Sequence, residues 1–131
     1  MARIIEIMEA AESNPASIME HKDNTYLRKF MTAAYLQKMN LPEGDPPYKE
    51  NAMDEYQVPT GAFWQFARNC DKYFRTDVPK IKLETNFIND LESVSKKEAK
   101  LILAAKDHKI HKLYKGLTLK KLQEVGYFPS N

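Results

Sequence analysis

The chain of 131 residues has the length of one domain and is long enough to bury a hydrophobic core of its own. Its 43% apolar and 29% charged residues are typical of a folded protein, and its four glycines are few for the many tight turns of an all-β fold. The formal net charge of +2 is uneven, because residues 96–131 hold nine of the 20 Lys and Arg but only three of the 18 Asp and Glu. We therefore expect one helical domain over residues 1–131, with a basic C-terminal part, residues 96–131.

The first predicted helix lies within MARIIEIMEAAESNP, where Ile4, Ile5, Met8 and Ala11 recur at helical spacing. Glutamates interrupt this stretch, so it lacks the continuous apolar region of a signal peptide. No run approaches the roughly 18 apolar residues of a membrane span. These features indicate a soluble protein of the cytosolic type, with no membrane partner.

Two further helical segments follow. Asn14 can cap a turn that begins at Pro15, because the N–H that proline lacks is not needed at a first helical position. Residues 24–39, NTYLRKFMTAAYLQKM, form the clearest amphipathic helix, with apolar residues at intervals of three and four. These apolar residues are Tyr26, Leu27, Phe30, Met31, Ala34, Tyr35 and Met39.

Residues 40–60, which we call the proline-rich segment, combine several prolines with five acidic residues. Proline removes a backbone donor and disfavours a helix. A connection of this length without secondary structure is uncommon in a compact domain and is often functional or mobile. Stiff prolines lose little entropy on docking, and an aromatic side chain can dominate an interface. The residues predicted to bind a partner protein are Leu41, Pro42, Pro46, Pro47 and Tyr48. In the alternative interpretation, Tyr48 only holds the segment against its own domain.

The most aromatic stretch is GAFWQFARNCDKYF, residues 61–74, which predicts another helix. The helical spacing of its aromatic residues, Trp64 among them, favours a place in the core over the stacking of nucleic-acid bases. Cys70 lies among these residues, which favours a buried, inert thiol over a nucleophile. Because it is the only cysteine, an internal disulfide is excluded and a Cys-rich zinc site has no support.

The remaining chain predicts three more helices. The first covers residues 80–94, and the second follows Ser95, which has capping-box spacing to Glu98. The third is LTLKKLQEVG, with Thr118 as its cap and Gly126 as its stop. The expected fold is an all-α, compact bundle of five or six helices with a long, acidic, proline-rich loop.

The lysines of the C-terminal part form a second candidate site. Lysine neutralises phosphates without reading sequence, whereas base reading prefers arginine, which residues 96–131 lack. The same lysines are also typical of the solvated face of an ordinary helical domain, and the acidic residues 1–95 weaken a nucleic-acid interpretation. A helix-turn-helix is disfavoured because the connection HKIHKLYKGLT is longer than the turn of that motif. The candidate residues are Lys96, Lys97, Lys100, Lys106, Lys109, Lys112, Lys115, Lys120 and Lys121.

Other chemistry finds little support in the sequence. His108 and His111 are three residues apart and could share a metal ion, but no third strong ligand lies near them in the sequence. The chain has no phosphate-binding glycine loop, dinucleotide fingerprint, zinc-protease motif or nucleophile elbow. We therefore expect no enzymatic activity, no cofactor and no metal.

Three stretches carry a family resemblance: YLRKFMTAAYLQKMNLPEGDPPYK, FINDLESVSKKEAKLILAAKD and YKGLTLKKLQEVGYF. They resemble a helix ending in a Leu-Pro-Glu-Gly…Pro-Pro-Tyr loop, a Leu-Glu-Ser…Glu-Ala-Lys-Leu-Leu helix pair and a Tyr-Lys-Gly-Leu-Thr ending. These motifs occur in a family of small proteins of large contractile-tailed bacteriophages, many of them marine. The resemblance covers residues 26–128 and implies a phage origin and expression in the cytoplasm of a bacterial host. It implies no catalytic or ligand-binding residue.

The leading hypothesis from the sequence is a non-enzymatic phage accessory protein that binds a phage or host protein through the proline-rich segment. The first alternative is a nucleic-acid-binding module that contacts the phosphate backbone through the C-terminal lysines. The second is a structural component of the virion.

Overall fold

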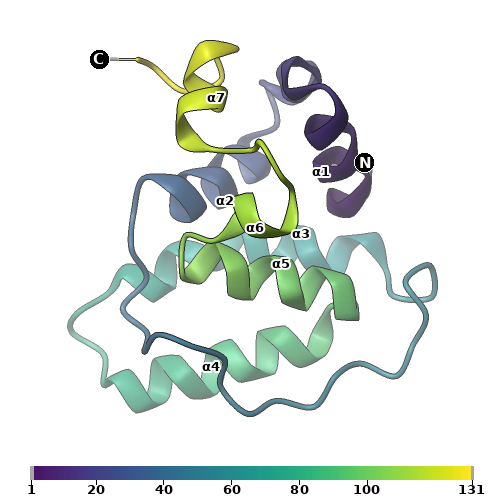
Figure 1. Cartoon of the computed structure of the whole chain (residues 1–131). Coiled ribbons are helices and arrows are strands. Elements are labelled where there is room, and N and C mark those ends of the chain that lie inside the picture. The colour runs from purple at the N-terminus through teal and green to yellow at the C-terminus, as the bar shows by residue number, and fades with distance from the viewer. Residues whose placement is uncertain (1, 131) are drawn as a thin grey trace.

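In the computed structural model, which describes residues 2–130, all regular elements are helices (Figure 1). The expected all-helical class is confirmed, although the elements outnumber the five or six helices expected, because short helices link the longer ones. None of the helices in the described residues is long and apolar enough to cross a membrane. In chain order the elements are α1 (Ile4–Ser13), η1 (Pro15–His21), α2 (Thr25–Tyr35), α3 (Thr60–Asn69), η2 (Cys70–Phe74), α4 (Lys80–Ser93), α5 (Lys96–Lys106), α6 (Ile110–Leu113) and α7 (Leu119–Glu124), where η1 and η2 are 3₁₀ helices.

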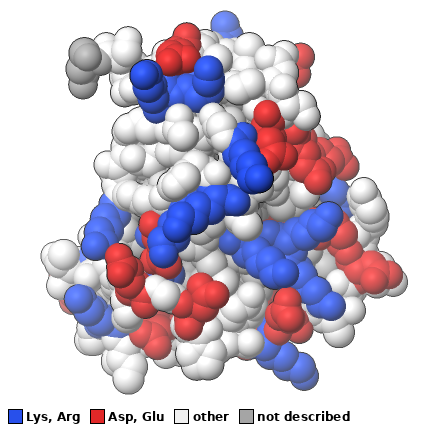
Figure 2. All heavy atoms as spheres, viewed as in Figure 1, with Lys and Arg blue, Asp and Glu red and all other residues white. Residues whose placement is uncertain are grey.

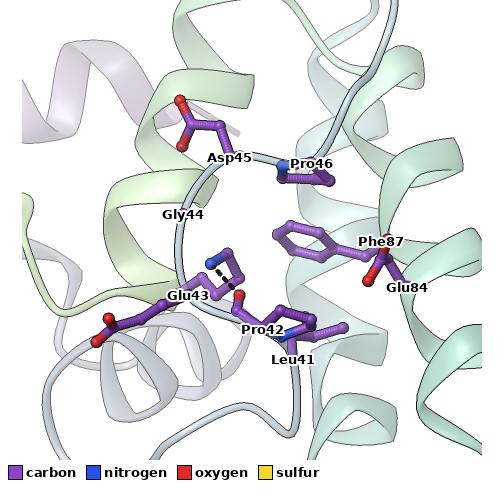
Figure 3. Close-up of a pocket in the computed structure, with 9 residues that line it drawn as sticks. Leu41, Pro42, Glu43, Gly44, Asp45, Pro46, Glu84 and Phe87 are labelled. Carbon is purple, nitrogen blue, oxygen red and sulfur yellow. Dashed lines mark hydrogen bonds between the residues drawn. The ribbon is translucent and has the colours of Figure 1, made fainter.

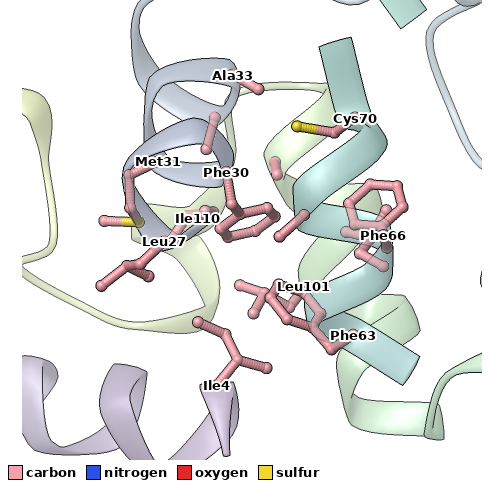
Figure 4. Close-up of a cluster of buried hydrophobic side chains, with 14 of the residues drawn as sticks. Ile4, Leu27, Phe30, Met31, Ala33, Phe63, Phe66, Cys70, Leu101 and Ile110 are labelled. Atoms are coloured by element: carbon pink, nitrogen blue, oxygen red, sulfur yellow. The ribbon is translucent and has the colours of Figure 1, made fainter. Parts of the chain in front are cut away.

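The hydrophobic core is centred on α2, α3 and α5. Phe30 of α2 lies edge-on to Phe63 and Phe66 of α3, with ring centroids 5.0 and 6.4 Å apart. Leu101 of α5 and Ile4 of α1 close the same cluster (Figure 4). All five side chains are buried, so the aromatic stretch predicted for the core does lie there. Burial of these large apolar groups is the main favourable contribution to folding.

The helix boundaries follow the capping signals of the sequence. Ser95 and Glu98 form the expected capping box, because each side chain accepts a hydrogen bond from the backbone N–H of the other residue. Thr118 caps α7, and Gly126 follows its end with φ of 91°, a left-handed conformation that glycine adopts without strain. Asn14 caps the turn that begins at Pro15, which is a 3₁₀ helix.

The amphipathic helix predicted over residues 24–39 is shorter than expected, because α2 ends at Tyr35. The N–H groups of Leu36 and Gln37 both donate to the carbonyl of Thr32, which closes the last turn. The chain then leaves the helix axis, and the N–H of Asn40 donates to the carbonyl of Tyr73 at 2.7 Å. Met39, which the helical periodicity placed on the apolar stripe of this helix, is buried from this irregular stretch instead.

Between α2 and α3 the backbone is neither helix nor strand from residue 36 to residue 59. This connection passes along α4 before it turns back to α3 (Figure 1). Leu41 is buried, and Tyr48 is half-buried against the core. The proline-rich segment therefore lies on the helices and contributes side chains to the packed interior.

Candidate functional site

A buried ion pair at the end of α5 holds the beginning of the proline-rich segment. The ammonium group of Lys106 donates to the carbonyl of Pro42 at 2.8 Å and to Oδ1 of Asp107 at 2.7 Å. The other carboxylate oxygen of Asp107 accepts from the N–H of Gly44 at 3.2 Å. Gly44 has φ of 86°, and this left-handed turn is accessible to glycine at little cost. The last residue of α5 and the residue that follows it thus bind both sides of the same turn.

Lys106 was expected to contribute to a phosphate-binding surface, and its position contradicts that expectation. Its side chain is only 2% exposed and its ammonium is already paired, so it cannot reach a phosphate. Lys106 lies four residues after Ile102, which is fully buried, and side chains at this spacing share a helix face. Helical geometry therefore directs this lysine inward, unlike the other lysines of α5.

Further contacts fix the rest of the proline-rich segment. The N–H of Lys49 donates to Oε2 of Glu92 on α4 at 2.8 Å. Arg3, at the start of α1, donates to the carbonyls of Glu55 and Val58 at 3.0 and 3.1 Å. Burial, together with the nearby carboxylates of Glu50 and Asp45, raises the pKa of Tyr48, which packs partly against the core. These partners could not be predicted, because they lie far from the segment along the chain and follow no motif.

The five predicted protein-binding residues are therefore divided between the interior and the surface. Leu41 is buried and packs in the core, while Pro46 and Tyr48 are half-buried. Pro42 and Pro47 are exposed. The surface that a partner could contact consists of the two exposed prolines and the outer parts of Pro46 and Tyr48.

A small hollow lies inside the turn of the segment (Figure 3). Its volume is about 150 Å³, and Leu41, Pro42, Pro46 and Phe87 supply its apolar lining. Figure 3 shows the ring of Phe87 facing into the turn, with the carboxylate groups of Glu43 and Asp45 directed away from that ring. A hollow of this volume can hold a group about as large as a benzene ring.

A wider groove lies on the other side of the same turn, between Gly44–Asp45 and the α5–α6 region. We call it the lysine groove; its volume is about 590 Å³. Lysine and arginine side chains gather over α5 and α6 in Figure 2, with acidic side chains at their edges. The lysine groove is lined by Gly44, Asp45, Lys100, Leu103, Ala104, Asp107, Lys109, Lys112 and Leu113.

The remaining lysines of the predicted nucleic-acid site are exposed but do not form one uninterrupted basic surface. Lys121 is paired with Glu124 at 3.1 Å on α7. The N–H of Lys115 donates to Oε2 of Glu12, which brings an acidic residue of α1 next to it. Basic and acidic side chains alternate over the face drawn in Figure 2. The exposed candidates are Lys96, Lys97, Lys100, Lys109, Lys112, Lys115, Lys120 and Lys121.

The other residues with potential chemistry serve the fold. Nε2 of His108 lies 2.5 Å from the carbonyl of Gln37, and no group of three possible metal ligands occurs within residues 2–130. Nε1 of Trp64 donates to the carbonyl of Ala2, and its ring is 5% exposed, so it offers no surface for base stacking. Cys70 is 1% exposed, and burial raises the pKa of its thiol to about 11, which disfavours the nucleophilic thiolate.

A buried carboxylate, Glu98, lies near the start of α5, and the half-buried Glu55 is near enough to act on its charge. Glu98 is 1% exposed, and its Oε2, like Oε1 of Glu55, has no hydrogen-bond partner within the described part of the chain. Burial first, and then the charge of Glu55, raises the pKa of Glu98. Arg3 lies near enough to offset part of this effect. Glu98 is therefore a buried polar group whose charge the surrounding structure disfavours.

No family model, curated protein or solved structure matches this chain. Its function therefore has to be inferred from the side chains, hollows and charges described above.

Proposed function

We propose that this protein is a non-enzymatic accessory protein that binds another protein through the face formed by the proline-rich segment and the α5–α6 region. The observation that carries the proposal is the turn at Gly44, which the Lys106–Asp107 pair holds in one position between two hollows. The sequence resemblance to proteins of contractile-tailed phages supports a phage or host protein as the partner, in the bacterial cytoplasm.

The energetics of the buried ion pair support this proposal. Removing two charges from water costs several kcal/mol per ion, and well-packed apolar residues in their place are often equally stable or more stable. The Lys106–Asp107 pair is therefore a weak way to stabilise the fold, but it fixes the backbone of a turn with directed hydrogen bonds. A turn that is already ordered loses less entropy when a partner binds.

The exposed surface of the segment also fits a role in binding. Pro42 and Pro47 are exposed and have fixed φ angles, so a partner can pack on them without ordering the backbone. Tyr48, which follows Pro47 in the chain, is half-buried and so presents part of its side chain at the surface. Aromatic residues surrounded by stiff backbone are frequent sites of high binding energy.

The test is capture of partners by the tagged full chain from infected bacterial cells, with and without nuclease, read by mass spectrometry. We expect a defined protein that survives nuclease and moderate salt, and whose recovery falls about tenfold or more with Pro47→Ala or Tyr48→Ala. Ile81→Ala is the matched control, because Ile81 is an apolar residue that is 77% exposed on α4. If the Tyr48 variant retained the partner and only unfolded at lower temperature, Tyr48 would serve the fold alone.

Binding to nucleic acid is the second candidate, and eight exposed lysines in residues 96–131 favour it. It requires contacts with the phosphate backbone, since the region lacks arginine for base reading. Binding of this kind weakens steeply between low and moderate salt. Partners that disappear with nuclease would favour this candidate, and co-purification with phage particles would favour a virion component.

A further inference from the structure

The lysine groove combines an apolar floor with free positive charge. Leu103 and Ala104 of α5 form part of its lining, and Leu113, at the end of α6, is 46% exposed. Few large apolar side chains within residues 2–130 are exposed to this degree. A half-exposed leucine beside a concave surface can gain further burial only from a second molecule.

The charges of the groove favour an anionic occupant. None of the ion pairs within residues 2–130 involves Lys100, Lys109 or Lys112, and all three side chains are exposed. Asp107 is paired with Lys106, so Asp45 is the remaining carboxylate in the lining without an ion pair. The lining of the groove therefore combines three lysines that form no ion pair with the apolar side chains of α5 and α6.

Both walls of the groove are fixed by hydrogen bonds. On one side, the N–H of Gly44 is bound to Asp107. On the other, the N–H of Lys109 donates to the carbonyl of Ala104 at 2.7 Å, and His108 takes a left-handed conformation with φ of 57°. This arrangement ends α5 and sets the direction in which the chain continues through Lys109 into α6, which carries Lys112. The groove thus exists before any partner arrives.

From these observations we infer that the lysine groove binds an acidic amphipathic segment of the partner protein, with an apolar side chain on Leu113 and carboxylates on Lys100, Lys109 and Lys112. A helix carries side chains of both kinds on one face at a spacing of three and four residues. A nucleic-acid backbone would satisfy the lysines but leave Leu113, which is 46% exposed, without an apolar contact. The inference rests on the proposed function and specifies the chemistry of its partner.

The test is a titration of the isotope-labelled full chain, followed by the NMR signals of its backbone amides. The probe is a synthetic helical peptide of about 16 residues, roughly four turns, with leucines and glutamates on one face. Two altered probes carry Gln for each Glu, or Ala for each Leu, and a thymidine oligonucleotide of equal charge is the nucleic-acid probe. We expect the acidic peptide to shift the amide signals of residues 43–45 and 100–113, and to bind about tenfold more tightly than either altered peptide or the oligonucleotide.

Variants of the groove complete the test. Leu113→Ala and the double variant Lys109→Gln/Lys112→Gln should each weaken binding about fivefold to tenfold, since their side chains are exposed and the fold should persist. The matched control is Lys22→Gln/Lys82→Gln, which removes the same charge from exposed positions outside the lining of the groove. The inference would be overturned if the acidic peptide shifted no amide signals. It would also be overturned if the oligonucleotide bound as tightly as the acidic peptide and Leu113→Ala weakened neither.

The two proposals fail in different ways. A captured partner that is lost with Tyr48→Ala but retained by the groove variants would keep the proposed function and reject the acidic segment. The absence of any protein partner for the unaltered chain would reject the proposed function, whatever the peptide does.

Discussion

Lys106 and Asp107 place opposite charges where little water reaches them, since their side chains are 2% and 9% exposed. The attraction between such charges roughly offsets their lost hydration, so the pair is sensitive to the loss of either member. Removing one partner leaves a buried charge without compensation, whereas removing both charges does not. Comparing the single and double variants therefore measures how strongly the two charges are coupled.

Lys106→Met should therefore lower the free energy of unfolding by about 3–5 kcal/mol, measured by chemical or thermal denaturation. The double variant Lys106→Met/Asp107→Asn should lower it much less, because Asn retains an acceptor for the N–H of Gly44. Equal losses in the single and double variants would show that the two charges are not coupled. Lys100→Met is the matched control, because it removes an exposed lysine of the same helix.

Glu98 makes the stability depend on pH in a direction that its surroundings determine. Its pKa is raised above the ordinary 4.5 by burial and by Glu55, so the folded state favours the protonated form. The stabilisation is therefore present below about pH 4.5 and is lost as the pH rises through the raised value.

Glu98→Gln should remove this dependence, because Gln is neutral and its carbonyl can still accept from the N–H of Ser95. We expect the variant to gain stability relative to the unaltered protein as the pH rises from 4.5 to 7, measured by denaturation at each pH. Glu20→Gln, which removes an exposed carboxylate, is the matched control. A constant difference between Glu98→Gln and the unaltered protein across this range would show that Glu98 is not the group responsible.

Lys106 also shows which features of a side chain can be predicted from the sequence and which cannot. The burial of Lys106 follows from its spacing to Ile102, so helical geometry could have separated it from the exposed lysines. The pairing of Lys106 with a carbonyl 64 residues away could not have been predicted, since no local pattern encodes it. Counting lysines along the chain therefore overestimated the basic surface.

Among the elements, the starts of helices were predicted better than the end of α2. Capping residues act through bonds to their own neighbours, which is why Ser95, Asn14 and Thr118 could be recognised from the sequence alone. The end of α2 depends instead on Asn40, whose N–H binds the carbonyl of Tyr73 from a distant part of the chain. The apolar periodicity extends past Tyr35 because Met39 is buried even though it lies outside the helix.

Replacing two glycines by alanine should change the free energy of unfolding in opposite directions. Gly126→Ala should lower the free energy of unfolding by about 1–2 kcal/mol, because φ of 91° is unfavourable for alanine and the new Cβ would meet only Met19 at 3.9 Å. Gly61→Ala, near the start of α3 in open space, should instead raise it by roughly 0.5 kcal/mol. Thermal unfolding of both variants checks the prediction, and a loss at both positions would contradict it.

At the scale of the whole molecule, composition and periodicity predicted the helical class, because each helix carries its own apolar stripe into the core. The path of the proline-rich segment could not be predicted. It is fixed by contacts between side chains and backbone that join Lys49 to Glu92 and Arg3 to residues 55–58. The residues of the proline-rich segment could thus be predicted from the sequence, whereas the lysine groove beside it could be recognised only in the folded structure.

The long-range contacts of the proline-rich segment have a consequence for the order of folding. Its bonds to α4 and α5 span 43 to 64 residues, so they can form only after these helices have assembled on the core. The segment is therefore expected to dock last during folding and to detach first in native-state fluctuations. A partner bound across it would hold this segment closed, and would thereby protect it from proteolysis in proportion to the fraction of molecules that are bound.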